Sequence, residues 1–194
     1  MNDRSKKLEG LVRALYEEQR KGREEWCDWL YENHVFIVAK NALFLAKKYD
    51  GNIDLAFAGA ILHDIADVST SRFSDNHEEL SLNIAEDAMI KAGFSGSDRA
   101  VVLEDILPKH SCRGDMRPLT LEGKIVASAD AIAHIDTDFY LFFAVNNFKN
   151  RDDFESLKAK LKAKLDRDFN SKLMFNDEKN FYRTKYENLK QLFS

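Results

Sequence analysis

The chain has 194 residues, with 29 basic against 33 acidic side chains and a formal net charge of −4, which argues against duplex nucleic acid as a partner. A chain of this length buries enough surface to fold without disulfides, and its two cysteines, Cys27 and Cys112, predict neither a disulfide framework nor a zinc cluster. Because no apolar run is long enough for a signal sequence or a membrane span, we expect a cytoplasmic protein without a membrane partner.

Helical periodicity runs through most of the chain. Glycine and proline are few, and apolar residues recur at spacings of three and four, which predicts an all-α fold. In chain order, the expected helices cover residues 8–16 with a continuation or restart at 26–30, then 34–49, 55–62, 74–93, 97–110, 121–136, 154–165 and 182–193.

Several residues indicate where these helices begin and end. Asn52 or Asp54 can cap the third helix, and Thr120 can cap the helix that follows it in the sequence LEGKIVASADAIAHID. Gly93 suits a left-handed C-terminal cap, and Pro108 should kink or end the helix in which it lies. The caps therefore place His63 and Asp64 near the end of an apolar helix.

Two carboxylates stand in apolar surroundings. Asp64 follows His63 at the end of an apolar helix, and Asp130 lies among alanines in the middle of another. A buried carboxylate without a partner costs several kcal/mol, so each acid needs a cation or several hydrogen-bond donors. A divalent metal supplies such a cation. The alternative for the His63–Asp64 pair is a helix end open to water.

Three other histidines allow more than one interpretation. His34 is in register with an inward, apolar helix face, where it is a ligand or a buried core residue. His77 is at the start of a helix, where it is either a metal ligand or an exposed first residue. His134 follows Asp130 by four residues and so lies on the same helix face. We expect it to contact the substrate, to support a ligand or to be a core residue, rather than to bind the metal.

In these residues the chain resembles the HD-domain superfamily of metal-dependent phosphohydrolases. That family's pattern is a histidine, a His-Asp pair and a distant aspartate, and His34, His63, Asp64 and Asp130 match it in order. The segment LHDIADV is similar to the family's LHDIGK-like string, and SADAIAHID to its ADxxD-like helix. The match covers about residues 34–135.

The resemblance also implies the domain organisation. We expect one HD-type domain over residues 1–194, built as a helical bundle with extra N- and C-terminal helices. Its core covers about residues 30–140, and a C-terminal extension covers about 141–194.

The family further implies a site for two metal ions. In HD proteins of that kind, His34, His63 and Asp130 would hold one ion, His77 and His110 the other, and Asp64 would bridge them. Imidazole and carboxylate ligands suit Mn, Fe, Co, Ni or Zn, and Mg stays among the candidates. The residues after His110, SCRGDMRP, lack the Gly-Tyr-Pro motif of the HD-GYP cyclic-dinucleotide phosphodiesterases, which argues against that activity.

Metal chemistry assigns catalytic roles to two acids. A metal-activated hydroxide can attack a phosphate ester, with Asp64 holding the metals. Asp67 lies four residues beyond His63, the offset at which HD-type 5′-deoxynucleotidases have a catalytic acid, and this likeness implies that Asp67 transfers a proton or orients the water. The alternative for Asp67 is a solvated acid at a helix end.

A phosphorylated substrate also needs cationic contacts. Arg72, Lys109, Arg113 and Arg117 flank the predicted ligands and are the candidate substrate-binding residues, although each is also consistent with ordinary surface charge. Cys112 has no dedicated histidine partner and receives no role.

Three functions compete. The leading hypothesis is a phosphohydrolase acting on a small phosphorylated molecule, with a nucleotide as its candidate substrate. An HD-type mixed-valent di-iron oxygenase uses the same ligand set and would depend on iron and oxygen, whereas a non-catalytic regulatory module would bind nucleotide without turnover. The amphipathic terminal helices permit a homodimer but do not require one.

Overall fold

The computed structural model describes residues 1–18, 20–149 and 153–193. Residues 150–152 and 194 of the expected C-terminal extension lie outside this description. The described residues form helices and connecting turns without a strand, which confirms the all-α prediction. None of the described helices combines the length and apolar character that crossing a bilayer requires.

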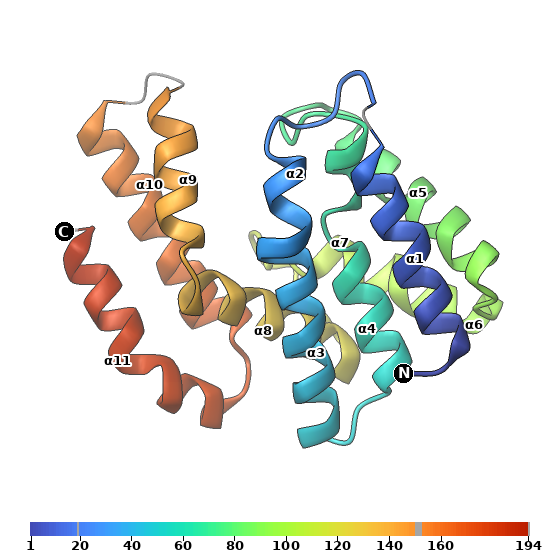
Figure 1. The fold of residues 1–194 in the computed structure, drawn as a ribbon. Helices are drawn as coiled ribbons and strands as arrows, with labels where there is room; N and C mark the ends of the chain where they lie inside the picture. Colours follow the sequence, from blue (N-terminus) through green and yellow to red (C-terminus); the bar gives the residue numbers. More distant parts are fainter. Residues whose placement is uncertain (19, 150–152, 194) are drawn as a thin grey trace.

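The helices follow one another with short connections (Figure 1). They are α1 (Asp3–Glu17), α2 (Cys27–Leu30), α3 (Phe36–Lys48), α4 (Ile53–Leu62), α5 (His77–Ala92), α6 (Gly96–Val101), α7 (Leu107–Lys109), α8 (Leu121–Asp136), α9 (Phe139–Lys149), α10 (Phe154–Arg167) and α11 (Asn176–Leu192). Shorter helical turns join or extend them: η1 (Tyr31–Val35), η2 (Ile65–Val68), η3 (Val102–Ile106) and η4 (Asp168–Lys172).

The expected caps form at the helix ends. The side chain of Asn52 accepts hydrogen bonds from the backbone N–H groups of Asp54 and Leu55, so Asn52, rather than Asp54, is the cap of α4. Gly93 adopts a left-handed conformation, with φ of 92°, and ends α5. Thr120 caps α8 by accepting a hydrogen bond from the Gly123 N–H group.

Helix α8 lies at the centre of the molecule. Figure 1 shows α1 to α7 (blue to green) on one side and α9 to α11 (orange to red) on the other, with α8 between them. Its alanines are fully buried, and such small side chains let neighbouring helices approach closely. The fully buried alanines of α8 are Ala127, Ala129, Ala131 and Ala133.

A glycine permits the close packing of α4. A Cβ atom added at Gly59 would lie 2.6 Å from Cγ2 of Ile106, in η3, and 3.2 Å from Cγ2 of Val126, in α8. The bare glycine backbone therefore lets α4 pack directly onto these two elements. This contact fixes the direction of α4, and His63 and Asp64 directly follow its last residue.

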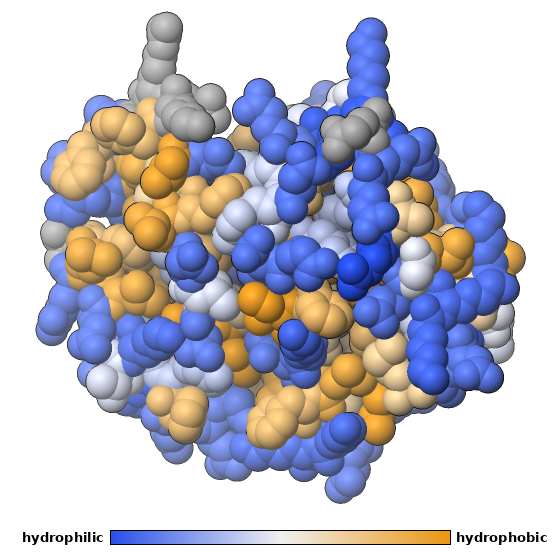
Figure 2. Space-filling view, viewed as in Figure 1, coloured by the Kyte–Doolittle hydropathy of each residue, from blue (hydrophilic) through white to orange (hydrophobic). Residues whose placement is uncertain are grey.

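Apolar side chains are exposed on the C-terminal helices. Figure 2 shows hydrophobic surface over the side of the molecule that these helices occupy, and exposed apolar residues there include Leu141, Val145 and Phe148 of α9. The homodimer that the terminal helices permit stays a prediction.

Candidate metal centre

Separate helices bring four of the expected ligands together. His34 comes from η1, just before α3, and His63 and Asp64 directly follow the last residue of α4. Asp130 lies in the middle of α8. All four side chains are buried, with Asp64 the most exposed at 9%. The interpretation of His63 and Asp64 as a helix end open to water therefore does not hold.

The polar atoms of these four residues lie close to one another. The two Nε2 atoms of His34 and His63 are 3.0 Å apart, and Oδ2 of Asp64 lies 3.7 and 3.4 Å from them, respectively. Oδ1 of Asp130 lies 3.4 Å from His34 Nε2 and 3.9 Å from His63 Nε2. Two imidazoles and two carboxylates thus face one point.

Hydrogen bonds set the tautomers of two histidines. Nδ1 of His63 lies 2.7 Å from the carbonyl oxygen of Ala60, and Nδ1 of His110 lies 2.7 Å from that of Leu107. A carbonyl only accepts hydrogen bonds, so in each ring the proton is on Nδ1 and the lone pair is on Nε2. Such an orienting bond behind the ring is typical of histidines that bind metals.

Asp130 has one oxygen bound and one facing the histidines. Its Oδ2 pairs with the ammonium group of Lys172, in η4. Its Oδ1 is buried and accepts no hydrogen bond within the described part of the chain, and it lies 3.1 Å from Nε2 of His134. A buried carboxylate oxygen among imidazole nitrogens fits a divalent cation, which needs such ligands and offsets the charge.

Neighbouring basic side chains lower the pKa of both aspartates. Burial alone would raise the pKa of Asp64, but Arg72, His63 and His34 outweigh it and hold this pKa well below its usual value. At Asp130, burial acts in the same upward direction, and His134 and Lys172 outweigh it, so its pKa is also well below the usual value. Both groups are therefore carboxylates at neutral pH, the form that binds metals.

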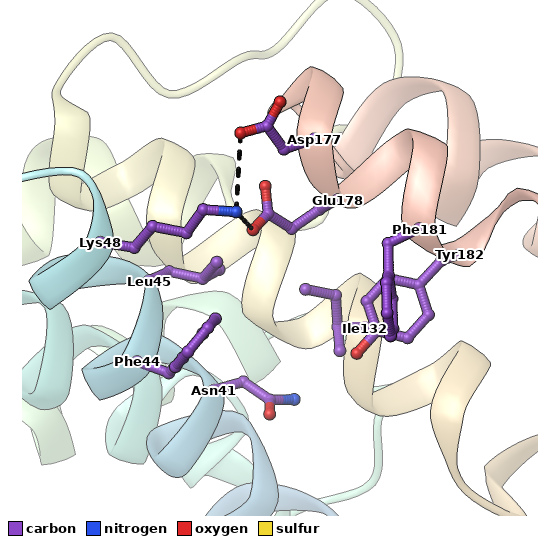
Figure 3. A pocket seen from close by; sticks show the side chains of 9 residues that line it. All are labelled: Asn41, Phe44, Leu45, Lys48, Ile132, Asp177, Glu178, Phe181 and Tyr182. Atoms are coloured by element: carbon purple, nitrogen blue, oxygen red, sulfur yellow. Dashed lines mark hydrogen bonds and ion pairs between the residues drawn. The ribbon is translucent and has the colours of Figure 1, made fainter.

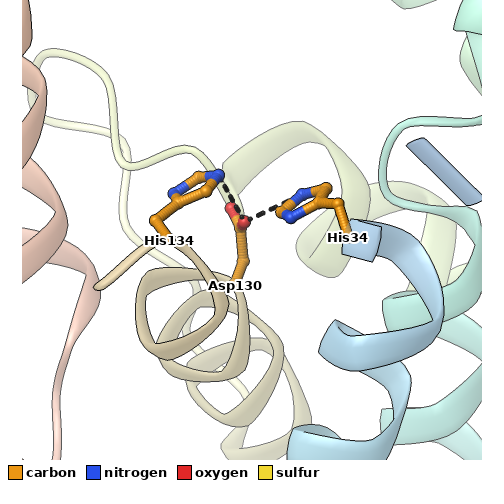
Figure 4. Close-up of side chains that lie close together, drawn as sticks. All are labelled: His34, Asp130 and His134. Atoms are coloured by element: carbon orange, nitrogen blue, oxygen red, sulfur yellow. Dashed lines mark ion pairs between the residues drawn. The ribbon is translucent and has the colours of Figure 1, made fainter. Parts of the chain in front are cut away.

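His134 belongs to the cluster, a placement that the sequence left open. Its ring stacks on that of His34, with centroids 4.9 Å apart and planes within 2°. Figure 4 shows Asp130 between the two histidines. His34, Asp130 and His134 form one group of atoms close enough to hold an ion, and His34, His63 and Asp64 form another.

The C-terminal helices supply residues that the sequence analysis missed. Nδ1 of His134 lies 2.9 Å from Oδ2 of Asp168, a fully buried carboxylate that also pairs with Lys164 at 3.2 Å and Lys172 at 3.6 Å. Tyr140 donates a hydrogen bond of 2.6 Å to the same carboxylate. The apolar spacing of Leu157, Leu161 and Leu165 continues to Asp168, a signal that could have placed this acid on a buried face.

Asp67 is held inside the protein. It is fully buried, so the interpretation of Asp67 as a solvated acid at a helix end does not hold. Its Oδ2 accepts a hydrogen bond of 2.8 Å from Nε of Arg72, and its Oδ1 lies 3.1 Å from Nε2 of His77. Nη2 of Arg72 also bonds to Asp64. Arg72 therefore links Asp67 to the metal centre.

His77 and His110 are not members of the two groups above. The His77 ring contacts Asp67, and the His110 ring packs against His63 with centroids 5.4 Å apart. Within the described ranges, neither histidine joins a group of three possible ligands. The second metal ion that the family resemblance implies stays a prediction.

The four candidate cations differ in their surroundings. Arg72 contacts the centre, and Arg113 lines a cavity together with it. Lys109 pairs with Asp105 at 2.7 Å, and Arg117 donates to carbonyl groups of its own loop, including those of Cys112 and Gly114. Arg72 and Arg113 thus line one cavity, and Lys109 and Arg117 do not.

Another cavity, of about 320 Å³, lies between α3 and α11, away from the cluster. Figure 3 shows Lys48 reaching across it to Asp177 and Glu178, with Phe44 and Phe181 nearby. No histidine lines this cavity, so it lacks the chemistry of the metal centre.

Fold and cluster together define an all-helical protein whose buried histidines and aspartates can hold a metal ion. The HD domain model matches residues 31–135, more than half of the chain, and this protein therefore belongs to the HD-domain family. No curated protein and no solved structure matches the chain.

Proposed function

We propose that this protein is a divalent-metal-dependent phosphohydrolase that cleaves a phosphate ester of a small molecule, with a nucleotide as the candidate substrate. One observation carries the proposal: the imidazoles of His34 and His63 and the carboxylates of Asp64 and Asp130 converge in a buried site, where Asp130 Oδ1 has no hydrogen-bond donor among the described residues. Family membership points to the same chemistry.

The four converging residues would hold the metal. When bound, a divalent metal supplies Lewis-acid polarisation of a phosphoryl group and lowers the pKa of water. The protein contributes the ligand positions, through the Ala60 carbonyl behind His63 and the Lys172 ammonium behind Asp130. A second ion near His110 and His77 is part of this proposal, and a metal content of two ions per chain would support it.

Arg72 is the residue best placed to bind the reacting phosphate. Its Nε and Nη2 atoms bond to Asp67 and Asp64, which fixes the plane of the guanidinium group. Among the described residues, Nη1 has no such partner and can donate to a phosphoryl oxygen. Arg72 would thereby orient the substrate over the metal ligands.

Asp67 is the candidate for proton transfer. Its Oδ1 lies 3.1 Å from Nε2 of His77, so a proton can be shared between these two atoms. In Asp67→Asn, we expect metal content close to that of the wild type and phosphate release reduced at least about 100-fold. Unchanged release would remove Asp67 from the mechanism.

The decisive experiment is phosphate release from a panel of nucleotides and sugar phosphates with added Mn²⁺. Asp64→Ala serves as the blank, and Asp87→Ala, which changes an exposed carboxylate on α5, is the matched control. We expect release by the wild type and the control but not by the blank. Absence of release from protein shown to hold its metal would contradict the proposal, and oxygen consumption by the iron-loaded protein would then favour the oxygenase.

A further inference from the structure

A cavity of about 370 Å³ opens beside the metal centre, between the helices on either side of α8. Three residues both line it and touch the cluster. Arg72 bonds to Asp64, Lys164 lies 3.3 Å from Nδ1 of His134, and the ring of Phe139 packs against that of His134 with centroids 3.9 Å apart. A molecule bound in the cavity would thus reach the metal ligands.

The cavity wall is strongly cationic. Its charged residues are all basic, namely Arg72, Arg113, Lys160, Lys164 and Arg167. Asp64 and Asp67 form ion pairs with Arg72, and Asp168 forms one with Lys164, so the charges of these two cations are balanced.

Two of these cations lack an acidic partner in the described ranges. Arg113 and Arg167 form no ion pair with any residue in the described ranges. Two guanidinium groups on a wall without acids favour an anion, and their planar donor geometry suits phosphate oxygens.

The same cavity is rich in aromatic rings, which are Trp26, Phe73, Phe139, Phe142 and Phe143. Phe142 is held in place by Trp29, whose ring stacks on it with centroids 3.7 Å apart and planes within 3°. Phe73 is 87% exposed, although it is a large apolar side chain beside a cavity. Aromatic rings that line a cavity suit a flat aromatic group of a ligand.

We propose that this cavity binds a flat aromatic ring joined to at least one anionic group besides the phosphate that is cleaved, as in a nucleoside diphosphate. The inference rests on the proposed function, which places the reacting phosphate at the metal centre beside Arg72. Arg113 and Arg167 then contact the second anionic group, and the ring lies among the phenylalanines. Arg167 and the phenylalanines of α9 follow the matched residues 31–135, whereas Arg113 lies within them, so this selectivity draws partly on residues outside the family's common segment.

Ligand binding can be measured by stopped-flow fluorescence, before a cleavable ligand turns over. The chain has only two tryptophans, Trp26 and Trp29, one lining the cavity and the other stacked on its wall. The full-length protein, loaded with Mn²⁺, is titrated with adenosine, AMP, pyrophosphate and the α,β-methylene analogue of ADP while tryptophan fluorescence is recorded. We expect the ADP analogue to bind about tenfold more tightly than AMP, and adenosine or pyrophosphate to bind more weakly than either nucleotide.

Two substitutions test the role of the guanidinium groups. Arg113→Gln and Arg167→Gln should each weaken binding of the ADP analogue about tenfold and change AMP affinity less than about twofold. Lys162→Gln is the matched control, because it removes one charge from α10 at a residue that does not line the cavity, and its affinities should equal those of the wild type.

The outcomes separate this inference from the proposed function. Equal affinities for AMP and the ADP analogue, or unchanged affinities in both arginine variants, would overturn the inference even if the protein released phosphate. The expected pattern of affinities without phosphate release from any substrate would uphold the ligand class and overturn the hydrolase.

Discussion

Lys172 is a buried cation between two buried carboxylates, Asp130 and Asp168. Bringing such charges out of water costs several kcal/mol each, and mutual attraction offsets this cost only while every partner is present. The ammonium group also leaves Asp130 Oδ1 directed at the histidines. Lys172 is thus both a stabilising counter-charge and a positioning residue for a metal ligand.

Removing this charge should destabilise the metal-free protein. We expect Lys172→Met to lower its free energy of unfolding by about 3–5 kcal/mol, because Asp130 and Asp168 each lose a paired cation. A bound metal replaces the missing charge, so Mn²⁺ should raise Tm more in this variant than in the wild type. Thermal unfolding with chelator and with Mn²⁺ measures both effects. Lys172→Arg, which keeps the charge, should retain more stability, and equal Tm values for Lys172→Met and the wild type would contradict the prediction.

Buried histidines predict a pH dependence. Burial lowers the pKa of His110 and of His134 to about 4, whereas histidine in an unfolded chain titrates near 6.5. Between these values the unfolded chain binds more protons than the folded one, so stability rises with pH across this window and is lost as pH falls through it. Urea unfolding of the chelated protein at pH 7 and pH 5 should show a lower midpoint at pH 5. His134→Gln should reduce the difference, and equal midpoints in the wild type would contradict the assignment.

At the scale of elements, Asp105 connects η3 to the start of α8. Its Oδ2 accepts hydrogen bonds from the backbone N–H of Thr120 at 2.9 Å and from the Thr120 hydroxyl at 2.6 Å, and its Oδ1 accepts from Lys109. Burial favours the neutral acid, but these bonds outweigh it and hold the pKa of Asp105 well below its usual value. The carboxylate thereby anchors the helix that carries Asp130.

Asp105→Asn should lower the free energy of unfolding at pH 7 by about 1–3 kcal/mol, because an amide cannot accept hydrogen bonds through its nitrogen. This loss of unfolding free energy should become smaller as pH falls below about 4. There the carboxyl group of the unfolded chain becomes protonated, and the stability that the folded carboxylate contributes decreases. Urea unfolding at pH 7 and pH 3 measures both values. Asp115→Asn, in the exposed loop before α8, is the control and should have little effect.

At the scale of the whole molecule, the metal centre joins segments far apart in the sequence. It draws on η1, the end of α4 and the middle of α8, and Lys172 extends it to η4. Ions bound there would restrain all of these segments together. The two sides of the molecule are therefore coupled through one charged cluster.

This coupling predicts the pattern of hydrogen exchange. Adding Mn²⁺ to the chelated protein should slow hydrogen exchange in η1, α3, the end of α4, α8 and η4. It should also raise Tm, because the metal binds the folded state and not the unfolded chain. Peptides from α1 and α6 should change little and act as internal controls. Asp64→Asn should weaken the response, and uniform slowing along the chain would argue against a metal at this cluster.

Short-range patterns were enough to predict much of this protein. Apolar spacing located most helices, although α9 was not predicted, and the caps at Gly93 and Thr120 formed where expected. The charge argument singled out Asp64 and Asp130 as acids that need a partner. These features depend on neighbours along the chain, within a few residues.

Contacts between distant segments were decided by packing. Asp168 and Lys172 are 38 and 42 residues beyond Asp130, and only the fold of α10 and η4 against α8 makes them its neighbours. The same packing joins His77 to Asp67 and brings Arg113 and Arg167 to one cavity. Helical periodicity tells which face of a segment is buried but not which other segment covers it, because that choice depends on the combined shape and charge of all the helices.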